Sequence, residues 1–391
     1  MAKIKHKGYG LVGWSAPLAL LGRPSAKEGL LMPKRIGFVY EQVISLDNCI
    51  LAVQEMARSK PKVRRAQYMK ENAEYFGKKL HEQLSSGTWE PRPYHEKTIG
   101  DGIEKKQRHI KVPCLWDQCV HHALMQITAP YIQRRNYFYN CGSIPGAGQI
   151  RITRAIKRWM AKKKMVKYGA SLDVHHFFES CKTEIVMKAL SRIFKDKKFL
   201  ALHRKVLDSM GGSLAIGFCP SHWYGNLVLS YIDNLIKQRL LPRADYGRYM
   251  DDMVILFNDK RKMHKAIRII SKVLKKLGLC LKKTWQVFKI AGRGIQFLSY
   301  RFFHGYTLLT KKLMYRITRR IKAQTKCKSP SPHAAASIIS YMGILKHCNS
   351  YNYMKDRVYP YVNIRKCKGV IRNEARRIHK LTTEVRNLRA A

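Results

Sequence analysis

Apolar positions recur at helical spacing in several stretches of the chain. The first stretch, residues 46–57, has one apolar face formed by Leu46, Ile50, Val53, Met56 and Ala57. Residues 66–84 have a similar character and end at a Ser-Ser-Gly sequence, which is typical of a helix stop. Residues 263–277 repeat the pattern later in the chain. Each stretch therefore predicts an amphipathic helix that packs one face on a core.

Strand patterns lie between these helical stretches. Residues 89–113 predict one hairpin. Residues 246–259, with the sequence YGRYMDDMVILFND, predict another, because an aromatic and basic stretch and an apolar run flank two adjacent acids. Adjacent side chains of a strand point to opposite faces, so Asp251 and Asp252 approach one site only at a turn. The pattern therefore predicts two carboxylates at the tip of a hairpin.

A third acid, Asp173, follows another short β-prone piece, in residues 171–180 with the sequence SLDVHHFFES. An isolated aspartate is more often a turn residue or a helix cap. Two Mg²⁺ ions about 3.5–4 Å apart activate an attacking hydroxyl and stabilise the leaving group in nucleotidyl transfer, and they need carboxylates from more than one strand. Because both acidic sites adjoin strand-like runs, Asp173, Asp251 and Asp252 predict such a site.

The charge of the chain indicates its partner. The 391 residues include 76 Lys and Arg against 25 Asp and Glu, for a formal net charge of +51. Such a charge repels itself strongly unless a polyanion neutralises it, and nucleic acid is the polyanion we expect. Hydrophobic residues make up 46% of the chain, which is enough to build the cores of two or three domains.

Neither a membrane nor an oxidising compartment is expected. No stretch reaches about 18 uncharged apolar residues, the length that a spanning helix needs. The apolar patch at residues 10–22 is short and rich in glycine, and we interpret it as part of a mature N-terminus. The ten cysteines contain no CxxC pair, so reduced thiols in the cytoplasm are expected.

These motifs, in this order, resemble those of reverse transcriptases. Tyr249-Met250-Asp251-Asp252 is similar to the YxDD box of that family, and Asp173 matches its first catalytic acid. The resemblance implies an α+β fold, a right-hand polymerase with fingers, a ferredoxin-like palm and a helical thumb. The implied domains are a basic N-terminal extension at 1–45, fingers at 46–165, a palm with the catalytic acids at 166–302 and a helical thumb at 303–391.

The resemblance implies two Mg²⁺ ions, which Mn²⁺ could replace, held by Asp173, Asp251 and Asp252 together with the backbone carbonyl of Val174. It also implies that Phe297, Leu298, Ser299 and Tyr300, in the sequence FLSY, support the primer end. The implied partners are a template and structured RNA, the cDNA/RNA duplex and dNTPs.

Five further residues are implied to bind the nucleotide. Arg108 would hold the triphosphate, and Lys283 would approach the leaving phosphate. Phe178 would lie under the sugar and exclude a 2′-hydroxyl. Ser221 and His222 would lie in the loop that positions template and nucleotide. Each has a plainer interpretation. Arg108 and Lys283 are also what a solvated basic surface contains, Phe178 is also an ordinary core residue, and Ser221 is also a helix cap.

Residues 216–222, with the sequence IGFCPSH, look like the IGxxxSQ box of diversity-generating retroelement enzymes. Residues 277–301 resemble the same subgroup. The subgroup implies an enzyme of bacteria, archaea or phages that copies a template-repeat RNA into cDNA with errors at adenines. It also implies a small basic accessory protein that forms an oligomer. His222 occupies the position of the subgroup's Gln, and its imidazole presents a donor and an acceptor in a different plane.

Two other classes stay open. The first comprises reverse transcriptases of the group II intron-like, retron or phage-defence types. The second is a non-catalytic RNA-binding scaffold. A scaffold has no need of three converging acids, so Asp173, Asp251 and Asp252 favour an enzyme.

Overall fold

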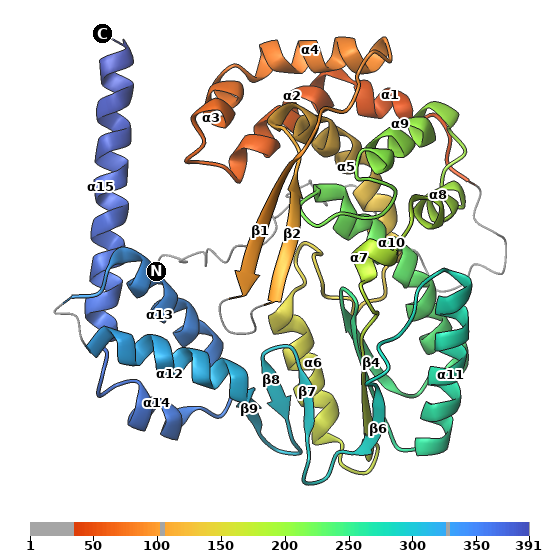
Figure 1. Ribbon diagram of the computed structural model, residues 1–391, viewed down its shortest axis with the longest axis vertical. Coiled ribbons are helices and arrows are strands. Elements are labelled where there is room, and N and C mark those ends of the chain that lie inside the picture. Colours follow the sequence, from red (N-terminus) through yellow and green to blue (C-terminus); the bar gives the residue numbers. More distant parts are fainter. Residues whose placement is uncertain (1–34, 102–105, 326–328, 391) are drawn as a thin grey trace. The chain divides into compact units, whose positions relative to one another are not determined.

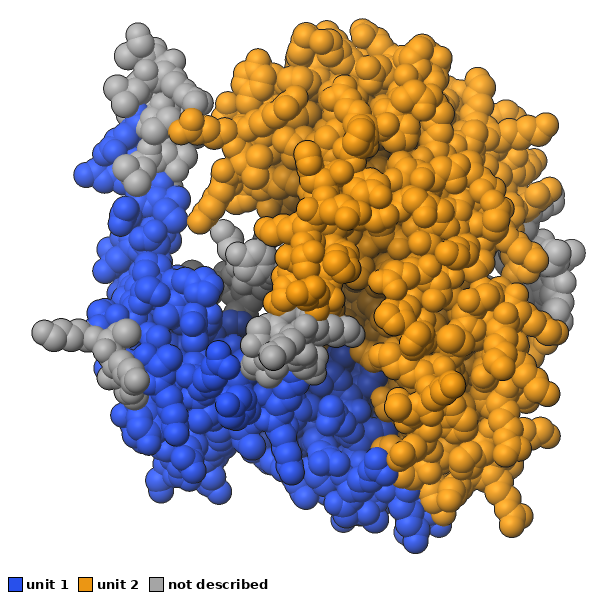
Figure 2. All heavy atoms as spheres, in the orientation of Figure 1, with its two compact units in different colours: residues 1–10, 153–167, 289–391 blue, residues 11–152, 168–288 orange. Residues whose placement is uncertain are grey.

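The computed structural model describes residues 35–101, 106–325 and 329–390 (Figure 1). Most of the predicted N-terminal extension, residues 1–34, lies outside this part of the chain. The chain divides into two compact units, which are coloured separately in Figure 2. We call residues 11–152 and 168–288 the larger unit, and residues 1–10, 153–167 and 289–391 the smaller unit.

The larger unit begins with a group of helices. These are α1 (Tyr40–Ile44), α2 (Leu46–Arg58), α3 (Arg64–Glu71), α4 (Ala73–Ser85) and α5 (Leu115–Arg135). The apolar face of α2 is buried, as its spacing predicts, and α2 packs against both α4 and α5. The helix predicted at residues 66–84 is two helices, because Asn72 between α3 and α4 leaves the helical conformation, with φ −109° and ψ 39°.

The predicted first hairpin is formed by β1 (His95–Asp101) and β2 (Lys106–Val112). The two strands pair antiparallel, with His95 opposite Val112 and Asp101 opposite Lys106 (Figure 1). Residues 102–105 at its tip lie outside the described part of the chain. The hairpin therefore projects the side chains of β2 from a base that joins directly to α5.

A four-stranded sheet forms the centre of the larger unit. Its strand order is β4 (Asp245–Tyr249), β5 (Asp252–Phe257), β3 (Tyr168–Leu172) and β6 (Gln286–Lys289). Both faces of β5 are covered, since every residue from Met253 to Phe257 is buried. Met253, Ile255 and Phe257 belong to one apolar core with the buried face of α11 (Lys260–Lys276). The pattern at residues 263–277 thus correctly predicts a core-packing helix.

The remaining helices of the larger unit follow β3. They are α7 (Phe177–Ser180), α8 (Thr183–Ser191), α9 (Lys197–Asp208), α10 (Cys219–Asn234) and the π-helical turn η2 (Leu235–Leu240). Nearly all of α10 is buried, and it packs against α5 and α8. Helix α10 is therefore a rigid support beside the sheet.

The smaller unit contains most of α6 (Gln149–Ala161) and a separate sheet of three short strands. These strands are β7 (Ile295–Phe297), β8 (Tyr300–Phe302) and β9 (Thr307–Leu309). Four helices follow, α12 (Lys311–Thr325), α13 (Pro332–Leu345), α14 (Tyr351–Arg357) and α15 (Ile364–Ala390). Helix α13 packs against α12 and α15. In the part of the chain that is described, no helix is both long and apolar enough to cross a membrane.

The predicted mixture of helices and sheets is confirmed. The boundaries of fingers, palm and thumb stay predictions, because compact units and polymerase subdomains are different divisions of a chain.

Candidate active site

The second predicted hairpin carries its two acids where the pattern places them. Tyr249 at the end of β4 pairs with Asp252 at the start of β5, so Met250 and Asp251 form a two-residue turn. Met250 has φ 56°, in the left-handed region that a two-residue hairpin turn requires. The backbone geometry therefore sets Asp251 at the tip and Asp252 at the first position of the next strand.

Asp173 reaches the same end of the sheet through strand pairing. Strand β3 runs antiparallel to β5, and its last residue, Leu172, lies opposite Met253. Asp173 directly follows the end of β3, and Asp252 directly precedes Met253. The register thus carries the third acid to the level of the hairpin turn, although about 80 residues of chain separate the two acidic sites.

Lys282 lies among these acids. The backbone N–H of Lys282 donates to the carbonyl of Asp173 at 2.9 Å, and Val174 forms a bridge with Leu281. The Lys282 ammonium forms an ion pair with Asp173 Oδ2. This hydrogen bond, together with the charges of Asp173, Asp251 and Asp252, raises the pKa of Lys282. One cation therefore lies within electrostatic reach of all three carboxylates.

The Asp251 carboxyl senses burial and the charges of its neighbours. Burial raises the pKa of the Asp251 carboxyl, and the charge of Asp173 raises it further. The positive charges of Lys282 and Arg108 act in the opposite direction. Arg108 on β2 is thus also within electrostatic reach of the turn. The site combines crowded negative charge with partial compensation from two cations.

A second group of predicted residues meets beside α10. The ring centroids of Phe178 on α7 and His222 on α10 lie 5.5 Å apart, with the rings in an edge-to-face arrangement. Burial lowers the pKa of His222 to about 4, so its imidazole is neutral at pH 7. Its Nδ1 atom is buried and has no hydrogen-bond partner among the described residues. Ser221 is fully buried and donates to Met210 Sδ at 3.5 Å, so it does not cap α10.

The hairpin of β1 and β2 is tied to the loop before α10. The backbone N–H of Lys111 donates to the carbonyl of Ile216 at 2.9 Å. Gly217 has φ 111°, and a Cβ atom added to it would lie 2.1 Å from the Lys111 carbonyl oxygen. Only glycine permits this approach. The contact fixes the base of the strand that carries Arg108.

A sequence model of the family described as reverse transcriptase (RNA-dependent DNA polymerase) matches residues 102–302, just over half of the chain. The chain belongs to the reverse transcriptase family. The match covers the three acids, the strand β2 and the helix α10.

Solved structures give more distant likenesses. A telomerase from Candida albicans, in complex with a TWJ fragment of telomeric RNA, is 12% identical with a TM-score of 0.45 over 74% of this chain and 61% of that chain. An apo telomerase from Candida tropicalis is 13% identical with a TM-score of 0.47 over 74% and 59%. The reverse transcriptase thus spans about three fifths of the length of these telomerases. No curated protein matches the sequence.

The donors of this reverse transcriptase fit a divalent cation in kind. Mg²⁺ prefers carboxylate and carbonyl oxygens, and Asp173 Oδ1 is a buried carboxylate oxygen without a hydrogen-bond partner in the described residues. A cation there would satisfy that atom and relieve the repulsion that raises the pKa of Asp251. Among the described residues, however, no three His, Cys, Asp or Glu side chains already surround a common point.

The structure adds one residue that sequence reasoning missed. Lys283, the predicted lysine of its segment, is exposed, whereas the preceding Lys282 contacts Asp173. The sequence does not distinguish which of the two adjacent lysines contacts the acids. The pairing of Val174 with Leu281 decides which of them faces the acids, and that pairing joins residues more than 100 positions apart.

The predicted primer-supporting residues belong to the smaller unit of the reverse transcriptase. Phe297 pairs with Tyr300, so Leu298 and Ser299 form the turn between β7 and β8, and Leu298 has φ 50°. The Tyr300 hydroxyl donates to the carbonyl of Ile344 at 3.0 Å. The turn is therefore anchored to α13, and its role at a primer end stays a prediction.

Proposed function

We propose that this reverse transcriptase synthesises cDNA on an RNA template at the end of the sheet that carries Asp173, Asp251 and Asp252. The observation that carries the proposal is the strand register, which brings Asp173 to the level of the turn of Asp251 and Asp252, with Lys282 in an ion pair with Asp173. Three acids at one end of a sheet concentrate negative charge, and such a site binds divalent metal ions.

In this mechanism Asp173, Asp251, Asp252 and the carbonyl of Val174 would hold two Mg²⁺ ions. When bound, the ions supply activation of the primer 3′-hydroxyl and neutralisation of the leaving pyrophosphate. Arg108 binds the triphosphate, because a guanidinium donates two parallel hydrogen bonds to phosphate oxygens.

Further residues position the nucleotide. The Phe178 ring, held against His222 at 5.5 Å, blocks the space that a ribose 2′-hydroxyl would need. Lys283, or the adjacent Lys282, would donate a proton to the leaving phosphate. The turn formed by Leu298 and Ser299 supports the primer end.

Primer extension on an RNA template with Mg²⁺ and dNTPs tests the activity. We expect Asp251→Asn and Asp252→Asn to lower the rate by on the order of a hundredfold or more, because each removes a charged metal ligand. Gly369→Ala is a suitable control, since no atom lies within 4 Å of the added methyl group. Unchanged synthesis by both aspartate variants would favour the RNA-binding scaffold instead.

We further propose that the enzyme belongs to a diversity-generating retroelement and copies a template-repeat RNA with errors at adenines. The IGFCPSH sequence and the environment of His222 support this assignment. Its neutral imidazole offers one donor and one acceptor, and Nδ1 has no partner among the described residues, so we infer that it constrains a template base less than a Gln amide would.

Sequencing of the cDNA tests the subgroup. Errors concentrated at template adenines are expected, and His222→Gln should change their frequency. Adenines copied as accurately as the other bases would contradict the proposal and favour a group II intron-like, retron or phage-defence enzyme. The proposed setting is the cytoplasm of a bacterium, an archaeon or a phage-infected cell, with a small basic accessory protein as partner.

A further inference from the structure

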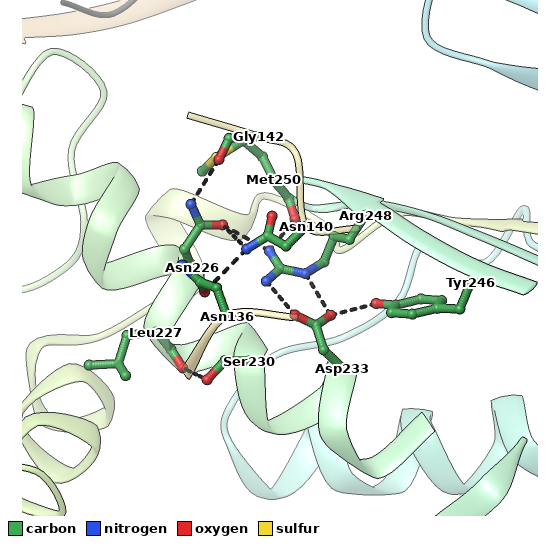
Figure 3. A network of polar contacts seen from close by, with 10 residues as sticks. All are labelled: Asn136, Asn140, Gly142, Asn226, Leu227, Ser230, Asp233, Tyr246, Arg248 and Met250. Carbon is green, nitrogen blue, oxygen red and sulfur yellow. Dashed lines mark hydrogen bonds and ion pairs between the residues drawn. The ribbon is translucent and has the colours of Figure 1, made fainter. Parts of the chain in front are cut away.

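A buried network of polar side chains lies directly beneath the hairpin turn of Met250 and Asp251 (Figure 3). Its members come from three separate segments of the larger unit and are Asn136, Asn140, Asn226, Asp233, Tyr246 and Arg248. Arg248 and Asp233 have no exposed surface at all. A charged pair removed from water to this degree requires a specific explanation.

The first half of the network is an ion pair between Arg248 and Asp233. Arg248 Nε donates to Asp233 Oδ1 at 2.8 Å, and Nη2 donates to Oδ2 at 2.7 Å, which is the two-pronged geometry of a guanidinium on a carboxylate. The Tyr246 hydroxyl donates to the same carboxylate at 2.6 Å. Buried ion pairs of this kind seldom stabilise a protein more than apolar residues of the same volume would. Stability alone therefore does not account for the pair.

The second half of the network connects Arg248 to the turn. Its Nη1 atom donates to the Met250 carbonyl at 2.8 Å and to Asn226 Oδ1 at 3.0 Å. Met250 has φ 56°, a conformation that non-glycine residues adopt at a cost and keep only where their surroundings fix it. The guanidinium therefore holds the carbonyl of the residue immediately before Asp251.

The loop at residues 139–142 holds the turn from its other side. Asn226 Nδ2 donates to the Gly142 carbonyl at 2.9 Å, and the Cys141 N–H donates to the Arg248 carbonyl at 2.8 Å. A Cβ atom added to Gly142 would lie 2.3 Å from the Met250 nitrogen. The turn thus fits between a glycine and a guanidinium, and both contacts act on the backbone of Met250.

We propose that Arg248, held in place by Asp233 and Asn226, is a positioning residue that directs the Asp251 carboxylate toward Asp173 and Asp252. The inference rests on the proposed function of these acids in metal binding. Rotation of the Met250 carbonyl away from Arg248 would displace the carboxylate of the next residue, Asp251. A displacement of about 1 Å at a reacting centre lowers the rate roughly a hundredfold.

Two variants test the proposal from opposite sides of the turn. In Arg248→Lys, a single ammonium keeps the charge beside Asp233 but cannot reproduce the fork that reaches Met250 as well. In Gly142→Ala, the ion pair is intact and the new methyl group displaces Met250. We expect both to lower kcat in primer extension by on the order of a hundredfold, while the KM for dNTP stays near that of the wild type.

Tyr246→Phe is the matched control within the network. It removes one hydrogen bond to Asp233 and leaves all four hydrogen bonds of Arg248 in place. It should lower the melting temperature without lowering kcat. Mn²⁺ affinity, measured by electron paramagnetic resonance without primer or dNTP, should fall in Arg248→Lys and Gly142→Ala but not in Tyr246→Phe.

Wild-type kcat and Mn²⁺ affinity in Gly142→Ala would overturn the proposal, whether or not Arg248→Lys folds. A loss of kcat in Tyr246→Phe in proportion to its melting temperature would also overturn it, because the network would then serve only the fold. Failure of the wild type to extend a primer would instead count against the proposed function, and Mn²⁺ affinity would still decide whether Arg248 positions Asp251.

Discussion

Lys282 forms an ion pair with Asp173, and its charge also acts on Asp251. Because its charge lowers the pKa of Asp251, its removal should raise that pKa. We expect the acidic limb of the pH–rate profile to move to higher pH in Lys282→Ala. With a higher pKa, a larger fraction of the Asp251 carboxyl is protonated at any given pH. Lys283→Ala is the matched control, because Lys283 is the adjacent lysine and its side chain is exposed, whereas Lys282 forms the ion pair with Asp173.

The measurement is the rate of primer extension across pH for both lysine variants. A shift of the acidic limb in Lys283→Ala alone would contradict the assignment of Lys282 to the site. A larger loss of maximal rate in Lys283→Ala would support Lys283 as the proton donor, as its segment predicts.

The charged Asp251 carboxylate should lower the free energy of unfolding at pH 7. Its folded-state pKa is raised by burial, so the folded state favours the neutral carboxyl. The stability that this preference contributes is present at low pH and is lost as pH rises through the raised pKa. Asp251→Asn avoids that loss, and we expect it to raise the melting temperature at pH 7 but not in acid.

Thermal unfolding in the presence of a chelator checks this expectation at both pH values. Asp259→Asn is the control, because hydrogen bonds from the N-terminal backbone of α11 lower the pKa of Asp259 instead. That variant should therefore lose stability at pH 7. Equal melting temperatures for Asp251→Asn and the wild type at pH 7 would contradict the burial of charge at the turn.

The hairpin of β1 and β2 depends on a single close contact at its base. Gly217→Ala places a methyl group against the Lys111 carbonyl, 2.1 Å away, and requires alanine to adopt φ 111°. We expect a destabilisation of roughly 1–3 kcal/mol and a higher KM for dNTP, because Arg108 would move with its strand. Gly100→Ala in the same hairpin meets no atom within 4 Å and should leave the KM unchanged. A wild-type KM in Gly217→Ala would show that the contact does not position Arg108.

Sequence reasoning predicts elements that depend on local pattern. The apolar faces of α2 and α11 and the acidic turn of Met250 and Asp251 follow from the local sequence pattern. The break at Asn72 is not visible in the pattern, because the residues on both sides of it favour a helix.

What sequence reasoning misses depends on pairing between distant strands. Arg248 belongs to the aromatic and basic strand of the predicted hairpin, and that pattern does not show that its side chain is fully buried with Asp233 of α10 as its counter-charge. The choice between Lys282 and Lys283 depends on the bridge of Val174 to Leu281. Tertiary contacts of this kind leave no periodic signal in the chain.

The net charge of +51 governs the behaviour of the whole molecule. We expect the protein to purify with bound RNA and to aggregate when the RNA is removed at low salt, because a polyanion offsets the repulsion between its basic residues. Binding to RNA should weaken steeply as salt rises, since each phosphate contact releases counterions. Absorbance ratios and light scattering check both expectations. A well-behaved monomer without nucleic acid at low salt would contradict them.

The most direct test of the central claim is anomalous diffraction from crystals of the enzyme with Mn²⁺, an RNA–DNA duplex and a non-hydrolysable dNTP. The account predicts two peaks at the end of the sheet, in contact with Asp173 and Asp251, with the Lys282 ammonium displaced from Asp173. Absence of Mn²⁺ from these carboxylates in the complete complex would contradict it.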